Sequence, residues 1–409
     1  MSGSREAFLG RQPIVGREGE LIGYELLYRA RATDDSARFD DEHSASLHVL
    51  STLLHDLGAP QVLAGRQAFI NVGADSLRDA GALVLLNPRR TVLELSHAIA
   101  LDADLLERIR MLREMGFGLA VPVAPPMEAL APWLPLATHL KVDLQKVPDG
   151  VLDEFVPALR CGDHVLVAEK VETEAQAHRC LALGFHAMQG WYLGRPEVMG
   201  SVRLGVSHGV LRRALAQLAA GATAAELEPT IKLDAALCWR LLRYTAASNF
   251  GMMITVDSLG HALELVGTRR LGRWLQLLLN TVEEPPPAAS TLMRAADFRG
   301  RMLEMVGAEC FEGTDCDNLF LVGALSMLPA MLMQPMTAAI ASLALPEPVA
   351  DALTMRQGRF GPLLDLVEAL ESGTPERVEA LCDTLTISSR TLARARRSAQ
   401  VAVQEAALA

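Results

Sequence analysis

The sequence lacks the signatures of several common protein classes. Its six cysteines are scattered and form no Cys-x-x-Cys pair, which argues against a zinc site or redox centre built on such pairs. Gly-rich phosphate-binding loops and the HExxH and GxSxG motifs are absent. Basic residues are outnumbered, 38 Lys and Arg against 49 Asp and Glu, for a net charge of -11. Because phosphate binding needs concentrated positive charge, no nucleic-acid partner is expected.

Long apolar runs are also missing. No stretch has the length and continuity typical of a transmembrane helix, and Met1–Arg11 lacks the apolar middle of a signal peptide. We therefore expect a cytoplasmic protein with no membrane partner.

The chain is nevertheless rich in core-forming residues. It has 409 residues, of which 50% are hydrophobic and 21% charged. This composition excludes a disordered chain, and the length allows two or three domains.

Residues 1–200 alternate short apolar runs with amphipathic stretches, the pattern of repeated strand–helix units around a parallel sheet. The runs recur often enough to predict an α/β domain, a closed TIM-like (β/α) barrel, rather than an open sheet. The predicted strands are Glu20–Tyr28, Gln67–Val72, Thr91–Leu95, Phe117–Val121, His139–Val142, His164–Ala168 and Ala187–Tyr192.

Residues 201–409 show helical periodicity broken by Gly and Pro, without strand-like runs. We therefore predict a second, all-α domain. Within it, Glu283–Pro287 is expected to be a stiff connection between two helices.

Polar residues close the predicted barrel strands. Because the C-terminal ends of barrel strands meet at one mouth, these residues are candidates for a site for a hard cation or an anionic ligand. Hydrogen bonds and salt bridges at the barrel rim are the simpler interpretation of each. The residues are Glu25, Arg29, Asn71, Ser96, His97, Pro122, Lys141, Asp143, Glu169, Glu172 and Gln189.

Five ordered stretches resemble the motifs of the EAL domain family. They are GYELLYR (Gly23–Arg29), FINV (Phe69–Val72), LKVD (Leu140–Asp143), VAEKVET (Val167–Thr173) and QGWYLGRP (Gln189–Pro196). The resemblance implies a barrel that hydrolyses the bacterial messenger cyclic-di-GMP with two divalent metals. It implies that Glu25 and Asn71 are metal ligands and that Arg29 contacts a phosphate of the bound dinucleotide. Four more residues match positions of the family's motifs: Lys141, Glu169, Glu172 and Gln189.

Three departures from the family pattern stand out. The stretch LELSH (Leu93–His97) places His97 where we expect a metal-ligating Glu, and Pro122 and Val123 stand where the family has two aspartates. Neither Pro nor Val offers an anionic oxygen to a metal. Lys170 also replaces a glycine of the family motif. We therefore expect no catalytic residue, no metal and no cofactor, and a vestigial site.

The second half resembles the HDOD family, a metal-free relative of HD phosphohydrolases. The resemblance rests on Lys232–Ser248, Asp257–Trp274, Phe320–Leu328 and Met355–Glu371. Where HD enzymes carry an adjacent His-Asp pair, this chain has Ser326 and Met327. No hydrolase centre is expected there.

One further feature is a basic stretch near the C-terminus, formed by Arg390, Arg394, Arg396 and Arg397. It fits either a solvated helix face that complements the helix dipole or a contact with an acidic partner.

Three functional hypotheses follow. The first is an inactive EAL–HDOD signal-transduction protein that acts through contacts with protein partners. The second is a receptor that binds cyclic-di-GMP without cutting it, and the third is an active phosphodiesterase. A homodimer is compatible with each of them.

Overall fold

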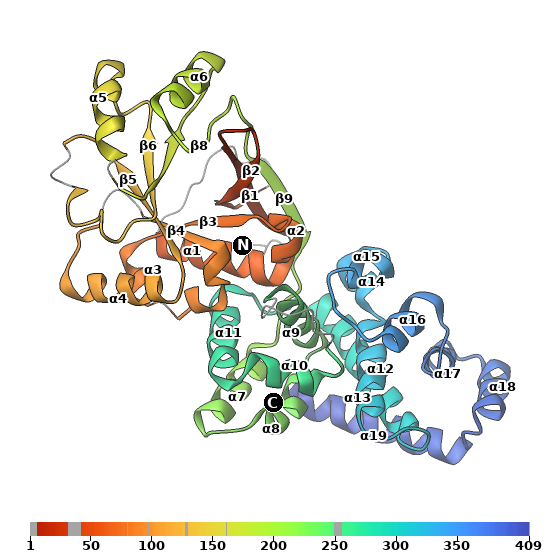
Figure 1. Ribbon diagram of the computed structural model, residues 1–409. Helices are drawn as coiled ribbons and strands as arrows, with labels where there is room; N and C mark the ends of the chain where they lie inside the picture. The colour runs from red at the N-terminus through yellow and green to blue at the C-terminus, as the bar shows by residue number, and fades with distance from the viewer. Residues whose placement is uncertain are drawn as a thin grey trace. The chain divides into compact units, whose positions relative to one another are not determined.

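The computed structural model describes residues 6–31, 42–79, 81–95, 99–126, 130–160, 162–248, 256–285 and 287–408. The chain divides into two units (Figure 1). The barrel unit comprises Glu6–Leu53 and Ala59–Ser201. The helical unit comprises Val202–Ala409 together with the short segment Leu54–Gly58.

Eight strands of the described residues close into a barrel. Strands β2 to β8 are parallel neighbours in chain order, and β1 pairs antiparallel with both β2 and β8. The strands are β1 (Glu6–Gly16), β2 (Leu21–Arg29), β3 (Gln67–Val72), β4 (Thr91–Leu95), β5 (Gly118–Val123), β6 (His139–Asp143), β7 (Val165–Glu169) and β8 (Ala187–Met188). A ninth strand, β9 (Glu197–Val202), lies next to β1.

The predicted barrel is thus confirmed, with two strands that were not predicted. Strand β1 contains Gly10 and Pro13 and continues into β2 through a tight turn rather than a helix, so it lacks the strand–helix signal. Strand β9 consists of exposed and half-buried residues and has no apolar run.

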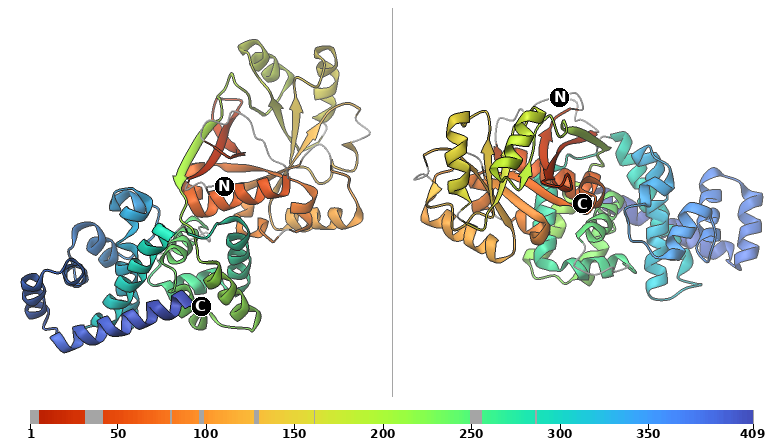
Figure 2. Two further views of the ribbon diagram at one scale, coloured as in Figure 1. Left: turned by 180° about the vertical axis from the view of Figure 1, so that it is seen from behind. Right: turned by 45° about the horizontal axis from the view of Figure 1, so that its top comes forward.

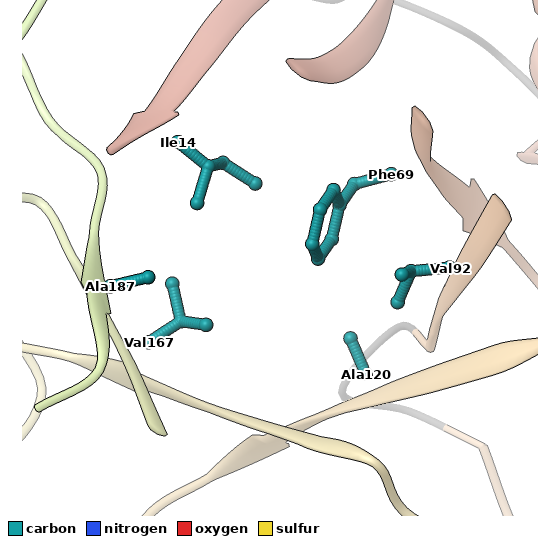
Figure 3. Packing of buried hydrophobic residues seen from close by; sticks show 6 residues of the cluster. All are labelled: Ile14, Phe69, Val92, Ala120, Val167 and Ala187. Carbon is teal, nitrogen blue, oxygen red and sulfur yellow. The ribbon is translucent and has the colours of Figure 1, made fainter. Parts of the chain in front are cut away.

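A single apolar layer fills the barrel (Figure 3). One side chain from each of six strands points inward, because alternate residues of a strand face the same side. Phe69 is the largest and is fully buried. The six residues are Ile14, Phe69, Val92, Ala120, Val167 and Ala187.

Helices connect the strands of the barrel unit. Asp102 caps α4 through a bond from the Leu105 amide, and Thr173 and Gln176 form a capping box on α6. The segments are α1 (Glu42–Ser51), the π-helix η1 (Thr52–Leu57), α2 (Ala59–Leu63), α3 (Ala74–Arg78), the 3-10 helices η2 (Leu83–Leu85) and η3 (Pro88–Arg90), α4 (Ala103–Glu114), α5 (Asp149–Leu159) and α6 (Glu174–Leu183).

Beyond β9, the regular elements of the described residues are helices. The long helix α19, blue in Figure 2, packs along α12. The helices are α7 (His208–Ala219), α8 (Ala224–Ile231), α9 (Ala235–Ser248), α10 (Leu259–Val266), α11 (Thr268–Thr281), α12 (Pro287–Gly307), α13 (Thr314–Leu325), α14 (Leu328–Leu332), α15 (Met336–Ile340), α16 (Glu347–Met355), α17 (Gly361–Ser372), α18 (Pro375–Leu385) and α19 (Ser389–Leu408).

One stretch of the helical unit, Thr314–Leu332, is long and apolar enough to cross a membrane by length and composition, which was not expected. Its most apolar window has a mean hydropathy of 1.3 and is 67% buried inside the protein. Burial of this kind is typical of a core helix as well.

The segment Leu54–Gly58 belongs to the helical unit through buried polar contacts. The Asp56 carboxylate accepts bonds from Arg240 at 3.0 Å and from Arg203 at 3.1 Å. The Trp274 indole donates to Nδ1 of His55 at 3.1 Å. Burial, followed by the charges of the nearby arginines, holds the pKa of His55 well below its usual value, so the ring is a neutral acceptor.

Candidate functional site

The polar residues of the barrel lie one layer above its apolar core. Every second residue of a strand faces inward, so the next inward-facing side chain lies two positions after each core residue. These next residues include Asn71 after Phe69, Glu94 after Val92, and Glu169 after Val167. The strand register and hydrogen bonds bring together Gln12, Glu25, Asn71, Glu94, Lys141, Glu169 and Gln189.

Lys141 is the centre of this cluster. Its side chain is fully buried, and its Nζ lies 2.6 Å from Oε1 of Glu94, 2.8 Å from Oε1 of Glu169 and 3.7 Å from Oε2 of Glu25. Burial by itself would lower the pKa of Lys141, but the three carboxylates raise it by more, so the pKa lies above its usual value. The lysine therefore stays charged.

Glu25 is fixed by amide donors. Asn71 donates to its Oε1 at 2.8 Å, and Gln189 donates both to its Oε2 and, at 3.0 Å, to Gln12. Burial raises the pKa of Glu25, but the Lys141 charge and these two hydrogen bonds together lower it by more. Glu25 is therefore an ionised carboxylate.

Glu94 behaves differently from Glu25. Burial, and then the charge of Glu25, raise the pKa of Glu94 to about 8. Its Oε2 is buried without a hydrogen-bond partner in the described part of the chain. One lysine therefore does not neutralise three buried carboxylates, and Glu94 retains a proton near neutral pH.

Glu94 was not among the predicted site residues. The acid of strand β4 was expected at the position of His97, which lies outside the described residues. In the structure the acid comes from within the strand, at Glu94, paired in register with Ala120. The period of two shared with Asn71 could have identified it.

Strand β5 contributes no acid to the cluster. Pro122 lies beside Lys141 in the parallel register, and Val123 lies beside Val142. Val123 is buried and Pro122 is half-buried. The position nearest to the lysine on this strand thus carries an apolar ring instead of an oxygen ligand.

The remaining predicted residues lie near the ends of the strands. Glu172 is exposed and accepts a bond from Gln145 at 2.9 Å. Arg29 is buried at the end of β2, and its Nη1 donates to the Tyr28 carbonyl at 2.7 Å. Lys170 is exposed, adopts a positive φ of 61°, and its charge lowers the pKa of Glu25.

The carboxylates of this cluster offer oxygen ligands to a metal ion. Oxygens of Glu25, Glu94 and Glu169 lie within 4.8 Å of one another, which fits one hard cation. The set does not fit the two-metal centre that the EAL resemblance implies, because Pro122 and Val123 supply no bridging carboxylate. Lys141 already occupies the space among the three acids as a cation.

Comparisons with known proteins show what the chain is similar to. No family model matches it. It is 25% identical over 382 residues to the cyclic di-GMP phosphodiesterase CdgJ of Vibrio cholerae serotype O1, covering 92% of this chain and 87% of the relative. It is 23% identical over 379 residues to the uncharacterized protein YuxH of Bacillus subtilis, covering 89% of this chain and 90% of the relative.

Solved structures match the chain over about half its length. The Bacillus subtilis YkuI protein, with an EAL domain and in complex with cyclic-di-GMP and calcium, is 22% identical with a TM-score of 0.39, over 47% of this chain and 56% of that one. The PaMucR phosphodiesterase in complex with cyclic-di-GMP is 26% identical with a TM-score of 0.39, over 47% of this chain and 92% of that one. The chain is thus similar to EAL-domain structures and, over most of its length, to a cyclic-di-GMP phosphodiesterase.

Proposed function

We propose that this chain is a cytoplasmic bacterial signalling protein of the cyclic-di-GMP type whose barrel does not hydrolyse the dinucleotide. It combines a degenerate EAL barrel with an HDOD helical domain and acts through contacts with other proteins. The observation that carries the proposal is the position of Pro122. It lies on β5 beside Lys141 of β6, and the phosphodiesterases that the sequence resembles have an aspartate at the position of Pro122.

The chemical reason is the loss of water activation. Hydrolysis of a phosphodiester near neutral pH requires a deprotonated water, and two metal ions provide it by lowering the pKa of that water. Glu25, Glu94 and Glu169 have oxygens for one cation, and their shared lysine competes for that place. A barrel without the second ion loses many powers of ten in rate.

The helical domain supports the same conclusion. Ser326 stands where an HD enzyme would carry part of its metal-binding pair. Its hydroxyl donates to the Gly323 carbonyl at 2.6 Å and accepts from Arg299 at 2.8 Å. These bonds tie Ser326 to its own helix end and to α12, a structural role.

An incubation with cyclic-di-GMP tests the proposal. We expect purified full-length protein with Mg²⁺ or Mn²⁺ to release no linear dinucleotide above a protein-free control, measured by chromatography. The Pro122→Asp, Val123→Asp double variant should gain product. Wild-type turnover that disappears in Glu25→Ala would refute the proposal.

A second candidate is a receptor that binds cyclic-di-GMP without cutting it. It is favoured by the cluster that remains around Lys141 and by Arg29 at the end of β2. In that case Arg29→Ala should weaken binding by about 1.5–3 kcal/mol, the range for a charge-assisted hydrogen bond. Arg66→Ala is the control, because Arg66 is exposed and precedes β3 at the opposite end of the barrel. Wild-type protein that shows no calorimetric binding at tens of micromolar would exclude this candidate.

A further inference from the structure

A pocket of about 500 Å³ opens on the helical unit between α12, α17 and α19. Its floor is apolar, with Met302 and Val367 buried, and its walls are the half-buried side chains of Phe298, Leu370 and Val403. Half-buried Phe and Leu side chains facing a hollow are typical of sites that receive an apolar partner.

The rim of this pocket carries uncompensated positive charge. Arg294 of α12 and Arg396 of α19 line it, and both are exposed. Neither makes an ion pair with any described residue, and Arg294 makes only a long bond of 3.3 Å to Thr291. The one acid of the lining, Glu371, is already bound by Arg299, with Nε to Oε1 at 3.2 Å. The pocket therefore combines an apolar floor with two guanidinium groups that have no carboxylate partner among the described residues.

A second pocket of about 710 Å³ lies between α17, α18 and the start of α19, and Leu370 lines both pockets. Its lining includes Leu392 of α19 but also two exposed acids, Glu379 and Asp383. The hollow with the positive rim is therefore the first pocket alone, called the groove below. A hollow beside a long helix can accept another helix through anchors at positions i, i+3 or i+4, and i+7.

We propose that this groove is the docking site for an acidic amphipathic helix of a protein partner. The apolar anchors of that helix would fill the floor around Phe298, and its carboxylates would pair with Arg294 and Arg396. The inference rests on the proposed function, in that it gives the protein contacts a location.

A pair of labelled peptides tests the proposal on the full-length protein. Both are 18-residue amphipathic helices with leucine anchors, one flanked by glutamates and the other by lysines at the same positions. By fluorescence anisotropy, we expect the acidic peptide to bind at least tenfold more tightly than the basic one. The Arg294→Glu, Arg396→Glu double variant should lose at least tenfold in affinity for the acidic peptide and gain affinity for the basic one.

Arg397→Glu is the matched control. Like Arg396→Glu, it reverses one charge at an exposed position of α19, but Arg397 does not line the pocket. We expect it to change the affinity less than threefold, and the thermal unfolding of all variants to match the wild type. Equal binding of the two peptides, or equal damage from Arg397→Glu, would overturn the proposal.

Two further results would also overturn it. One is the absence of acidic-peptide binding up to millimolar concentration. The other is a wild-type dimer in sedimentation that the double variant converts to a monomer, which would assign the groove to a second copy. Neither result depends on whether the barrel hydrolyses cyclic-di-GMP, so this inference and the proposed function can fail separately.

Discussion

Lys141 holds three carboxyl groups, those of Glu25, Glu94 and Glu169, around one buried ammonium group. The closest contacts are 2.6 Å to Glu94 and 2.8 Å to Glu169. Taking several charges out of water is costly, and only their mutual pairing offsets that cost. Removal of the cation should therefore harm the barrel more than removal of an exposed one.

We predict that Lys141→Met destabilises the protein by about 3–5 kcal/mol, the cost of leaving buried charges unpaired. Lys146→Met is the matched control, since Lys146 is 53% exposed and lies 3.8 Å from Asp143, and it should cost about 0–1 kcal/mol. Urea unfolding of both variants measures the difference. Equal losses would show that the buried cluster has no special weight.

The pKa of Glu94 predicts a specific pH dependence. The pKa of Glu94 is about 8 in the folded protein, against its usual value of 4.5. Between these two pH values the folded protein therefore keeps a proton that the unfolded chain has released. Stability then falls as the pH rises between these two values. The pKa of buried His139, lowered by burial to about 4, acts in the opposite direction, but only below pH 6.5.

Between pH 6.5 and 8 we therefore expect wild-type stability to fall by about 1–2 kcal/mol relative to Glu94→Gln. Unfolding temperatures across this range provide the measurement. Glu107→Gln, at an exposed position of α4, should follow the wild type. Parallel curves for wild type and Glu94→Gln would contradict the raised pKa.

At the scale of residues, the site could be predicted in part. Glu25, Asn71, Lys141 and Gln189 were identified from motifs and lie together in the structure. The prediction missed Glu94 because it considered only the polar residues that close each apolar run. Inward-facing residues also recur at every second position within a strand, and Glu94 is one of them. Which acid keeps its proton depends on three-dimensional charge density, and a linear motif does not contain it.

At the scale of elements, the seven parallel strands were predicted closely, because their apolar runs are short and separated by amphipathic helices. The structure extends β5 to Val123 and shortens the last of them to Ala187–Met188. Local periodicity does not predict that β1 closes the barrel, because this closure depends on its antiparallel pairing with β8, far away in the sequence.

The segment Leu54–Gly58 is the element that sequence patterns least suggest. It follows α1 as the end of a π-helix, yet its contacts belong to the helical unit. Asp56 is 1% exposed and Arg240 is fully buried, so each depends on the other for charge compensation.

We predict that Asp56→Asn destabilises the helical unit by about 3–5 kcal/mol, because Arg240 keeps its buried charge without a counterion. Asp153→Asn breaks an exposed pair with Arg179 at 3.1 Å and should cost about 0–1 kcal/mol. Chemical denaturation followed by tryptophan fluorescence, to which Trp239 and Trp274 of this unit contribute, measures the loss. A loss in Asp56→Asn no larger than in the control would mean that the buried pair does not stabilise the unit.

At the scale of the whole molecule, a barrel unit and a helical unit share one chain, and relatives at 23% and 25% identity span about nine tenths of it. The barrel brings Glu25, Glu94 and Lys141 together, and it has Pro122 and Val123 on β5. The motifs predicted Glu25, Lys141, Pro122 and Val123 at this site, and the structure adds Glu94 of β4, so the proposed inactivity rests on β5 alone.

The number of Mn²⁺ ions bound per chain tests this account most directly. Calorimetric titration of the full-length protein at neutral pH should find at most one weakly bound ion, because three carboxylates around Lys141 fit a single cation. The Pro122→Asp, Val123→Asp variant should bind a second ion. Two tightly bound Mn²⁺ ions in the wild-type protein, both lost in Glu25→Ala, would contradict the account.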